Sequence, residues 1–358
     1  MERWSKEKAW EFWNNNPWMI GCNYVPSLTP GLSLWHEDTI EEILPSVHKE
    51  LALMKEIGFN TVRMFLNFDI WFYEKDIFFD RIDRVLDIFK SYNIKLMPVL
   101  FNDCVSFGKP DDISIKKPKG KETWDKGYHG GHKNSPHVVS NGKPIGWIRW
   151  DEDDQRPLCE EFLRSIIRRF KNDDRIIMWD LWNEPGNSKR GDLSITYLKK
   201  AFEIARKENP SQSLTAGVWA YPENYGVDEK LDVSPIQRVA LDLSDIVTFH
   251  NYSNLEEVKN CINALEKEGR PLANTEWLHR ILDNNVFEQL PLYHSKKIGS
   301  IHWGLVAGHG QFYLPWEWLK DQRPDLDYSL WQHDIFKENF TPYDENEIAL
   351  FKKLCKDK

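Results

Sequence analysis

Two glutamates lie where the sequence predicts that buried β-strands end. The first, Glu184, follows Asn183 and an apolar run over residues 176–182, and it precedes Pro185 and Gly186. These last two residues end the strand, because proline cannot donate to a sheet ladder and glycine frees the backbone. In α/β folds, ligands meet the protein at the carboxyl ends of buried strands. We therefore interpret Asn183 and Glu184 as active-site residues and not as the polar start of a loop.

Glu276 ends a second apolar strand, predicted over residues 271–277. The two glutamates are 92 positions apart, about 31 residues for each of three strand–helix units, which is the size expected of such units. Glu276 should then lie at the same height as Glu184, three strands further around a barrel. Two carboxylates about 5 Å apart can cleave a glycosidic bond by double displacement with retention of configuration. This chemistry needs no metal and no cofactor.

The elements that must position these glutamates predict an α/β fold, the (β/α)8 or TIM barrel. Helical patterns alternate with eight strands that are apolar enough to be buried on both faces, as in a closed parallel barrel. A doubly wound open sheet is less well supported, because no Gly-rich phosphate loop follows any strand. We treat residues 1–358 as a single domain. The strands are expected over residues 19–24, 60–68, 95–101, 176–182, 213–219, 246–250, 271–277 and 299–306, and the main helices over 39–57, 79–92, 158–170, 192–208, 255–268, 286–297 and 345–356.

A long insertion over residues 102–155 separates the third strand from the next helix. It is rich in Gly, Pro, Lys and Asp, yet it carries large aromatic side chains at Trp124, Tyr128, Trp147 and Trp150. A long connection in a compact domain is usually a functional loop. We therefore predict that this insertion forms one wall of a substrate cleft, with Trp147 and Trp150 stacking on sugar rings.

The motifs together resemble those of the clan of retaining β-glycoside hydrolases on (β/α)8 barrels. The resemblance is closest to glycoside hydrolase family 5, the cellulase and mannanase family, and to its relatives often labelled xylanase. It spans nearly the whole chain, and it implies a hydrolase of β-linked oligo- or polysaccharides. Besides Asn183-Glu184-Pro185 and Glu276, it rests on Gly21–Tyr24, Gly58–Arg63, His250-Asn251-Tyr252 and His302–Leu305.

The same resemblance implies a role for each matching residue. Glu276 is the expected nucleophile, and Glu184 is the expected general acid and then base. Asn183 is expected to bind the 2-hydroxyl of the sugar. The other substrate-binding residues implied at the −1 subsite, where the cleaved sugar binds, are Arg63 beneath the nucleophile, His250, Tyr252 and the platform Trp303.

The end of the third strand departs from the family pattern. Family members commonly have a histidine there, whereas this chain has Asn102. An asparagine can donate a hydrogen bond to a sugar hydroxyl but does not titrate. We include Asn102 among the substrate-binding residues, and the departure leaves the subfamily and its sugar open.

Glu184 must hold a proton near neutral pH to act as an acid, which requires a raised pKa. We expect the charge of Glu276 and desolvation near Trp182 to raise it.

Three alternative functions use the same sequence features. A transglycosylase would share every residue named above. A barrel that only binds carbohydrate would be signalled by a replaced glutamate, and both glutamates are present. A metal-dependent hydrolase is suggested by His129, His132 and His137, but residues 23–26 on the first strand offer no ligands. We therefore expect no metal.

The charge and composition of the chain limit which binding partners and which cellular compartment we expect. The formal net charge of −9 does not favour nucleic acid, and no apolar run approaches the ~18 residues that a bilayer requires. Carbohydrate is the expected partner, and the oligomeric state is open. The amino terminus lacks the pattern of a signal peptide, so we expect a cytoplasmic protein, although a secreted mature form would have the same sequence. The five widely spaced cysteines predict reduced thiols.

Overall fold

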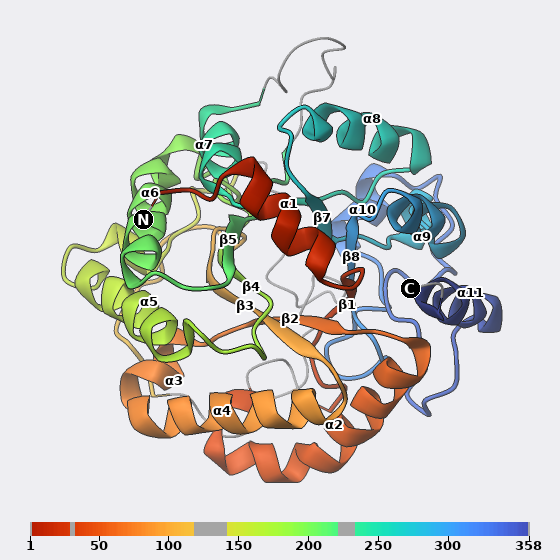
Figure 1. Ribbon diagram of the computed structural model, residues 1–358, viewed down its shortest axis with the longest axis horizontal. Helices are drawn as coiled ribbons and strands as arrows, with labels where there is room; N and C mark the ends of the chain where they lie inside the picture. Colours follow the sequence, from red (N-terminus) through yellow and green to blue (C-terminus); the bar gives the residue numbers. More distant parts are fainter. Residues whose placement is uncertain (1, 29–32, 118–141, 221–232, 357–358) are drawn as a thin grey trace.

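The computed structural model describes residues 2–28, 33–117, 142–220 and 233–356, which form a parallel barrel surrounded by helices (Figure 1). The strands pair in the order β5-β4-β3-β2-β1-β8-β7-β6. The barrel closes where Val218, just after β5, accepts from His250 at 2.8 Å and donates to Thr248 at 3.0 Å. The predicted (β/α)8 barrel is confirmed. The strands are β1 (Ile20–Asn23), β2 (Thr61–Phe65), β3 (Lys95–Asn102), β4 (Met178–Asn183), β5 (Ser213–Ala216), β6 (Val247–His250), β7 (Leu272–Glu276) and β8 (Gly299–Trp303).

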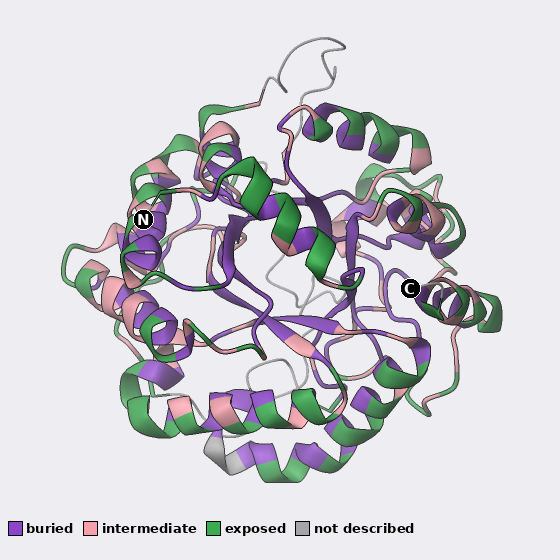
Figure 2. Ribbon diagram, viewed as in Figure 1, coloured by how far each residue is buried: buried purple, intermediate pink, exposed green. Residues whose placement is uncertain are grey.

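Amphipathic helices cover the outside of the barrel, with their buried faces toward the strands (Figure 2). In α5, for example, Phe162, Leu163, Ile166 and Ile167 recur at helical spacing and are buried. The helices are α1 (Lys6–Asn15), α2 (Glu37–Ile57), α3 (Phe68–Tyr73), α4 (Lys75–Ser91), α5 (Arg156–Phe170), α6 (Ile195–Glu208), α7 (Pro235–Leu243), α8 (Leu255–Glu266), α9 (Val286–Ser295), α10 (Glu317–Gln322) and α11 (Glu345–Lys356).

The short helix α3 was not predicted, and the strand expected over residues 60–68 ends at Phe65. The side chain of Asn67 accepts a hydrogen bond from the backbone of Ile70 at 2.8 Å. This cap satisfies an N–H group at the start of a helix, so the chain turns into a helix where the apolar pattern alone suggested more strand.

Helix α1 lies across the amino-terminal end of the barrel (Figure 1). Its Ala9 and Trp13 join an apolar cluster with residues at the amino ends of the strands, among them Met19, Met97 and Ile246. This cluster fills the bottom of the barrel. The carboxyl ends of the strands are therefore the end available for chemistry, as in other barrels of this kind.

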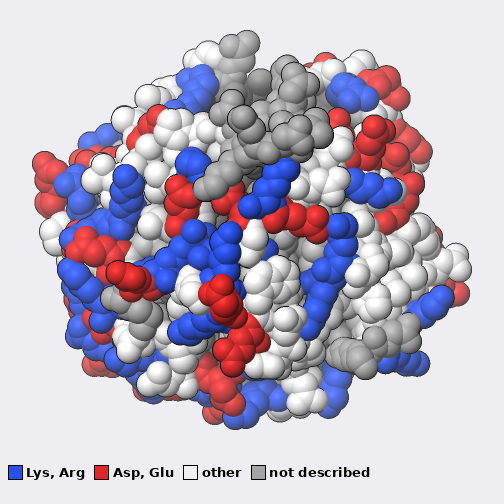
Figure 3. All heavy atoms as spheres, turned by 45° about the horizontal axis from the view of Figure 1, so that its top comes forward, with Lys and Arg blue, Asp and Glu red and all other residues white. Residues whose placement is uncertain are grey.

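The two described flanks of the insertion lie against one another, since Phe107 and Gly146 pair as an isolated bridge. None of the helices formed by the described residues is long and apolar enough to span a bilayer. On the face drawn in Figure 3, basic side chains alternate with acidic ones over much of the described surface. The described part of that face therefore carries charges of both signs.

Candidate active site

Parallel pairing brings the polar ends of the strands to one edge of the barrel. Asn23 of β1 lies beside both Arg63 and Trp303. In the same way, Asn102 lies beside Asn183, and the end of β6 lies beside the end of β7. Residues far apart in the sequence therefore meet at the carboxyl-terminal mouth.

Strand β4 has a register shift between Asp180 and Trp182. Asp180 and Asn183 both bind Arg63, so both face the inside of the barrel. Trp182, between them, packs on Phe101 at a centroid distance of 5.2 Å in the layer outside. In a regular strand, residues an odd number apart face opposite sides. The bulge thus places Asp180 and Asn183 on the same side, next to the expected acid.

Strand β7 has a similar irregularity before its glutamate. Its pairing with β6 shifts register between Asn274 and Glu276. Asn274 donates to the hydroxyl of Tyr293 in the surrounding helix α9, at 2.9 Å, and so faces outward. Glu276, only two residues later, accepts from Arg63 inside the barrel. Both strands therefore use a local bulge to direct functional side chains into the mouth.

Arg63 joins the polar side chains at the centre of the site. Its guanidinium donates to Asp180 at 2.8 and 2.9 Å, to Asn23 at 2.6 Å, to Asn183 at 2.5 Å and to Glu276 at 2.9 Å. The Arg63 side chain is fully buried. An arginine fixed by this many partners holds a positive charge directly beside one oxygen of Glu276.

Tyr252 donates to the other oxygen of Glu276 at 2.9 Å. Burial, and then the charges of Glu276 and Glu184, raise the pKa of Tyr252 well above its ordinary value. The phenol consequently keeps its proton and remains a donor. Glu276 is thus held from two sides, by a cation and by a neutral hydroxyl.

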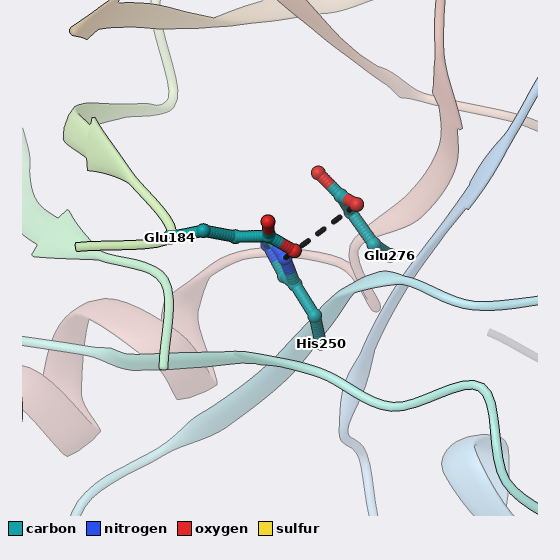
Figure 4. Close-up of side chains that lie close together, drawn as sticks. All are labelled: Glu184, His250 and Glu276. Carbon is teal, nitrogen blue, oxygen red and sulfur yellow. Dashed lines mark hydrogen bonds and ion pairs between the residues drawn. The ribbon is translucent and has the colours of Figure 1, made fainter. Parts of the chain in front are cut away.

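Glu184 approaches Glu276 from the opposite side of the mouth, and His250 lies between them (Figure 4). The Nδ1 atom of His250 is 2.8 Å from Glu184 Oε1 and 3.5 Å from Glu276 Oε2. Oxygen atoms of the two glutamates lie within 4.8 Å of one another. The second Glu184 oxygen accepts from Asn187 at 2.5 Å. Both carboxylates can therefore reach the same bond of one bound substrate molecule.

The pKa that we expected to be raised at Glu184 is in fact lowered. Burial by itself raises the pKa of this carboxyl, but the hydrogen bond and charge of His250, the amide of Asn187 and the charge of Arg63 outweigh burial. Trp182, which we expected to desolvate the group, faces the outer layer. The sequence could not show that the ring of His250 would point at Glu184.

Asn102 and Trp303 lie at the mouth as expected, yet both are already engaged by the chain. The Asn102 amide donates to the Cys104 carbonyl, and its oxygen accepts from Cys104 N–H and from Asn183 Nδ2, each at 2.8 Å. The Trp303 ring packs against Phe65 and Phe312 and is only 4% exposed. Asn102 therefore orients Asn183, and little of the Trp303 ring face is open.

The expectation that Trp150 stacks on a sugar is wrong. Trp150 is 2% exposed and packs on Phe101, Trp182 and Tyr197 at centroid distances of 5.2 to 5.8 Å. The ring fills the layer between β4 and the outer helices. Complete burial of a large aromatic side chain stabilises the fold more than partial exposure on the wall of a cleft would.

Trp147 is half-buried and donates to Glu152 at 2.7 Å. This leaves part of its ring open. The other aromatic residues and the histidines that we named in the insertion, Trp124, Tyr128, His129, His132 and His137, lie outside the described residues.

Three residues near the site escaped the sequence analysis. Asp103 is buried directly after β3, and a carboxylate at that strand end was a visible signal. Cys104 follows it, and burial together with the charges of Glu184 and Glu276 raises the pKa of its thiol well above the ordinary value. Arg190 is buried in the loop after β4, and its spacing in the sequence carried no signal.

The cluster Glu184, His250 and Glu276 could also offer a metal ion one ligand atom from each residue. However, one Glu276 oxygen already accepts from Arg63 and the other from Tyr252. A guanidinium in contact with a ligand repels a divalent cation. This donor set fits proton transfer better than metal binding.

Comparisons with known proteins agree with this geometry. The family model described as "Cellulase (glycosyl hydrolase family 5)" matches residues 24–303, more than half of the chain. No curated protein matches the sequence.

Solved structures share the fold at low identity. The exo-β-1,4-mannosidase Op5Man5 from Opitutaceae bacterium strain TAV5 is 16% identical, with a TM-score of 0.56 over 95% of this chain and 59% of that one. The β-1,4-mannanase from the sea hare Aplysia kurodai is 13% identical, with a TM-score of 0.57 over 96% and 94%. A β-galactosidase from the haloarchaeon Halorubrum lacusprofundi is 11% identical, with a TM-score of 0.56 over 95% and 58%.

The chain thus spans well under two thirds of the mannosidase and the β-galactosidase, and at these identities the likeness shows the fold alone. The family match identifies the activity class. The chain is a glycosidase that belongs to the cellulase family, glycosyl hydrolase family 5.

Proposed function

We propose that this glycosidase cleaves β-linked oligo- or polysaccharides by double displacement with retention of configuration. The observation that carries the proposal is that Glu184 and Glu276 have oxygen atoms within 4.8 Å of one another. Retaining enzymes place their carboxyl groups about 5–5.5 Å apart, whereas inverting enzymes leave about 6.5–9.5 Å for a water molecule. An oxygen–oxygen separation of this size supports the retaining arrangement.

In the first step, an oxygen of Glu276 attacks the anomeric carbon. The glycosidic bond breaks while Glu184 gives its proton to the leaving oxygen. Arg63 and Tyr252 stabilise the ionised nucleophile and direct it, since each binds one of its oxygens. Asn183, oriented by Asn102 and Arg63, is placed to contact the 2-hydroxyl.

In the second step, Glu184 removes a proton from water as the water attacks the same carbon. The bond between that carbon and Glu276 breaks as the new bond to the water oxygen forms, and its electron pair restores the Glu276 carboxylate. His250 is 2.8 Å from Glu184, so the proton that the acid needs can pass between these two groups.

The substrate class is proposed from the structural neighbours. Two of those described above are named for β-1,4-mannans or mannosides and one for β-galactosides. We propose β-mannosides as the first substrates to test, with β-glucosides and β-galactosides in the same panel.

The test is turnover of aryl β-glycosides followed by proton NMR. A retaining enzyme releases the β-anomer first, and the α-anomer appears only as the sugar mutarotates. Initial release of the α-anomer would contradict the mechanism. Release of the aryl group without free sugar would indicate transfer to another sugar in place of hydrolysis.

A further inference from the structure

The loop that carries Glu184 has an unusual backbone. Glu184, Ser188 and Lys189 have φ angles of 46°, 50° and 64°, and Gly186 and Gly191 are also positive. A left-handed conformation is unfavourable for residues with a side chain, and it persists only where surrounding contacts enforce it. The strand alone therefore does not position the acid. Contacts from other segments must do so.

Asp103 supplies such contacts on both sides of Glu184. Its carboxylate accepts from Gly186 N–H at 2.6 Å, and its own N–H donates to the carbonyl of Asn183 at 3.1 Å. The Asp103 side chain is fully buried. Asp103 therefore binds the backbone on both sides of Glu184, at the residue before it and at the residue two positions after it.

Arg190 connects Asp103 to the far flank of the insertion. Its Nε atom is 3.2 Å from Asp103 Oδ1. Its two terminal nitrogens each donate to Asp151 at 2.8 Å, and one also donates to the carbonyl of Gly146 at 2.6 Å. The Arg190 side chain is 1% exposed and that of Asp151 is 27% exposed. A planar guanidinium with this many partners has one allowed position.

We propose that Asp103, Arg190 and Asp151 form an ionic clamp that positions Glu184 as the acid and base. The proposal rests on the proposed function, in which Glu184 protonates the leaving oxygen. The clamp ties the end of β3, the loop after β4 and residues 146–151 into one unit. Ser188, whose hydroxyl donates to Val105 at 2.7 Å, adds a parallel tie between the same segments.

The members of the clamp act through Glu184. Asp103 and Arg190 are buried, so neither is open to a bound sugar. Burial raises the pKa of Asp103, and the hydrogen bonds of Ser194 and Gly186 and the charge of Arg190 partly offset this. Removing Arg190 would leave a buried carboxylate without its cation, which is strongly unfavourable. The loop would then move to let solvent reach Asp103.

The experiment compares kcat/KM for two glycosides of the same sugar, one with a dinitrophenyl leaving group and one with an alkyl leaving group. Only the alkyl glycoside needs an acid during bond cleavage. A general acid contributes about 10²–10⁴-fold, so Arg190→Lys should lower kcat/KM for the alkyl glycoside about 10²-fold. The dinitrophenyl glycoside should stay within about threefold of the wild type. Asp151→Asn, at the half-exposed end of the clamp, should act in the same direction by about tenfold or less.

Arg206→Lys is the matched control. Arg206 pairs with Asp245 at 2.9 Å and is also buried, but Asp245 binds the backbone of Trp4 and Leu214 near the amino ends of the strands. This variant should lower Tm while the ratio of the two kcat/KM values stays constant.

Glu184→Ala measured in the same series separates the two proposals. If Glu184→Ala fails to discriminate between the leaving groups, the proposed acid role is wrong. If Glu184→Ala discriminates but Arg190→Lys and Asp151→Asn change both substrates equally, or neither, the clamp is overturned and the proposed function stands.

Discussion

The two carboxylates that we propose to be catalytic are held in different ways. Glu276 ends a buried strand and is held inside the barrel by Arg63 and Tyr252. Glu184 lies one residue beyond its strand, with a left-handed backbone. Its neighbour Gly186 is held by Asp103, which comes from the segment after β3.

This difference matches two requirements of the proposed reaction. The nucleophile must keep one charge state and one position, and the rigid barrel interior provides both. The acid must exchange a proton twice in each cycle, and its contact with His250 permits that exchange. In this arrangement the barrel interior fixes the position and charge of the proposed nucleophile, while the loops set the surroundings of the proposed acid.

Loss of the nucleophile should have the largest effect. Glu276→Ala should lower kcat by far more than 10²-fold, because no other described group can form the covalent intermediate. Azide or formate should restore turnover and give the inverted product. Retention of more than about a hundredth of wild-type kcat would show that Glu276 is not the nucleophile.

Arg63→Lys tests how strictly the barrel interior holds Glu276. Lysine keeps the positive charge but cannot contact Asp180, Asn23, Asn183 and Glu276 together as Arg63 does. We expect kcat to fall about 10- to 100-fold, with a loss of roughly 1–3 kcal/mol in unfolding free energy from the unpaired groups. Steady-state kinetics and urea unfolding measure the two effects. Near-normal kcat would mean that charge alone, without geometry, supports the nucleophile.

His250→Asn tests how contact with the imidazole affects Glu184. Activity requires protonated Glu184, so kcat/KM falls as pH rises through the pKa of that group. Contact with His250 lowers this pKa and burial raises it, so removing the imidazole should move the alkaline limb to higher pH. The maximum should drop about tenfold as the proton relay is lost. A pH profile of kcat/KM tests this prediction. A shift of the alkaline limb to lower pH would contradict the assigned effect of His250.

Trp150→Ala and Trp147→Ala compare the buried and the half-open ring of the insertion. Trp150 is part of the core, so its loss should cost about 3–5 kcal/mol of stability and leave the ratio of oligosaccharide to monoglycoside activity unchanged. Trp147→Ala should raise KM for oligosaccharides severalfold and change stability less. Thermal unfolding and KM are measured on both variants. If only Trp150→Ala changed the ratio of oligosaccharide to monoglycoside activity, Trp150 and not Trp147 would be the ring that contacts the sugar.

Removal of metal ions should have the smallest effect. Dialysis against EDTA is expected to leave kcat and Tm unchanged, because Arg63 and Tyr252 already bind the oxygens of Glu276. Loss of activity that zinc restores would show that Glu184, His250 and Glu276 share an ion, and the division of roles between the glutamates would no longer hold.

The sequence by itself determined the barrel and the two strand ends. Apolar runs, helical spacing and the Pro185-Gly186 terminator are local patterns, and local patterns can be interpreted without knowledge of the fold. The resemblance also placed Arg63, His250 and Tyr252 around the glutamates, and the structure brings these residues together.

Tertiary structure decided which way side chains face and what they contact. Trp182 faces outward because of a bulge in β4, and such a bulge depends on pairing with the neighbouring strand. The lowered pKa of Glu184 depends on the position of His250, and the burial of Trp150 depends on packing against Phe101. The contact between Asp103 and Arg190 joins distant segments. Distances of this kind follow from the packing of the whole barrel, which no local pattern of residues encodes.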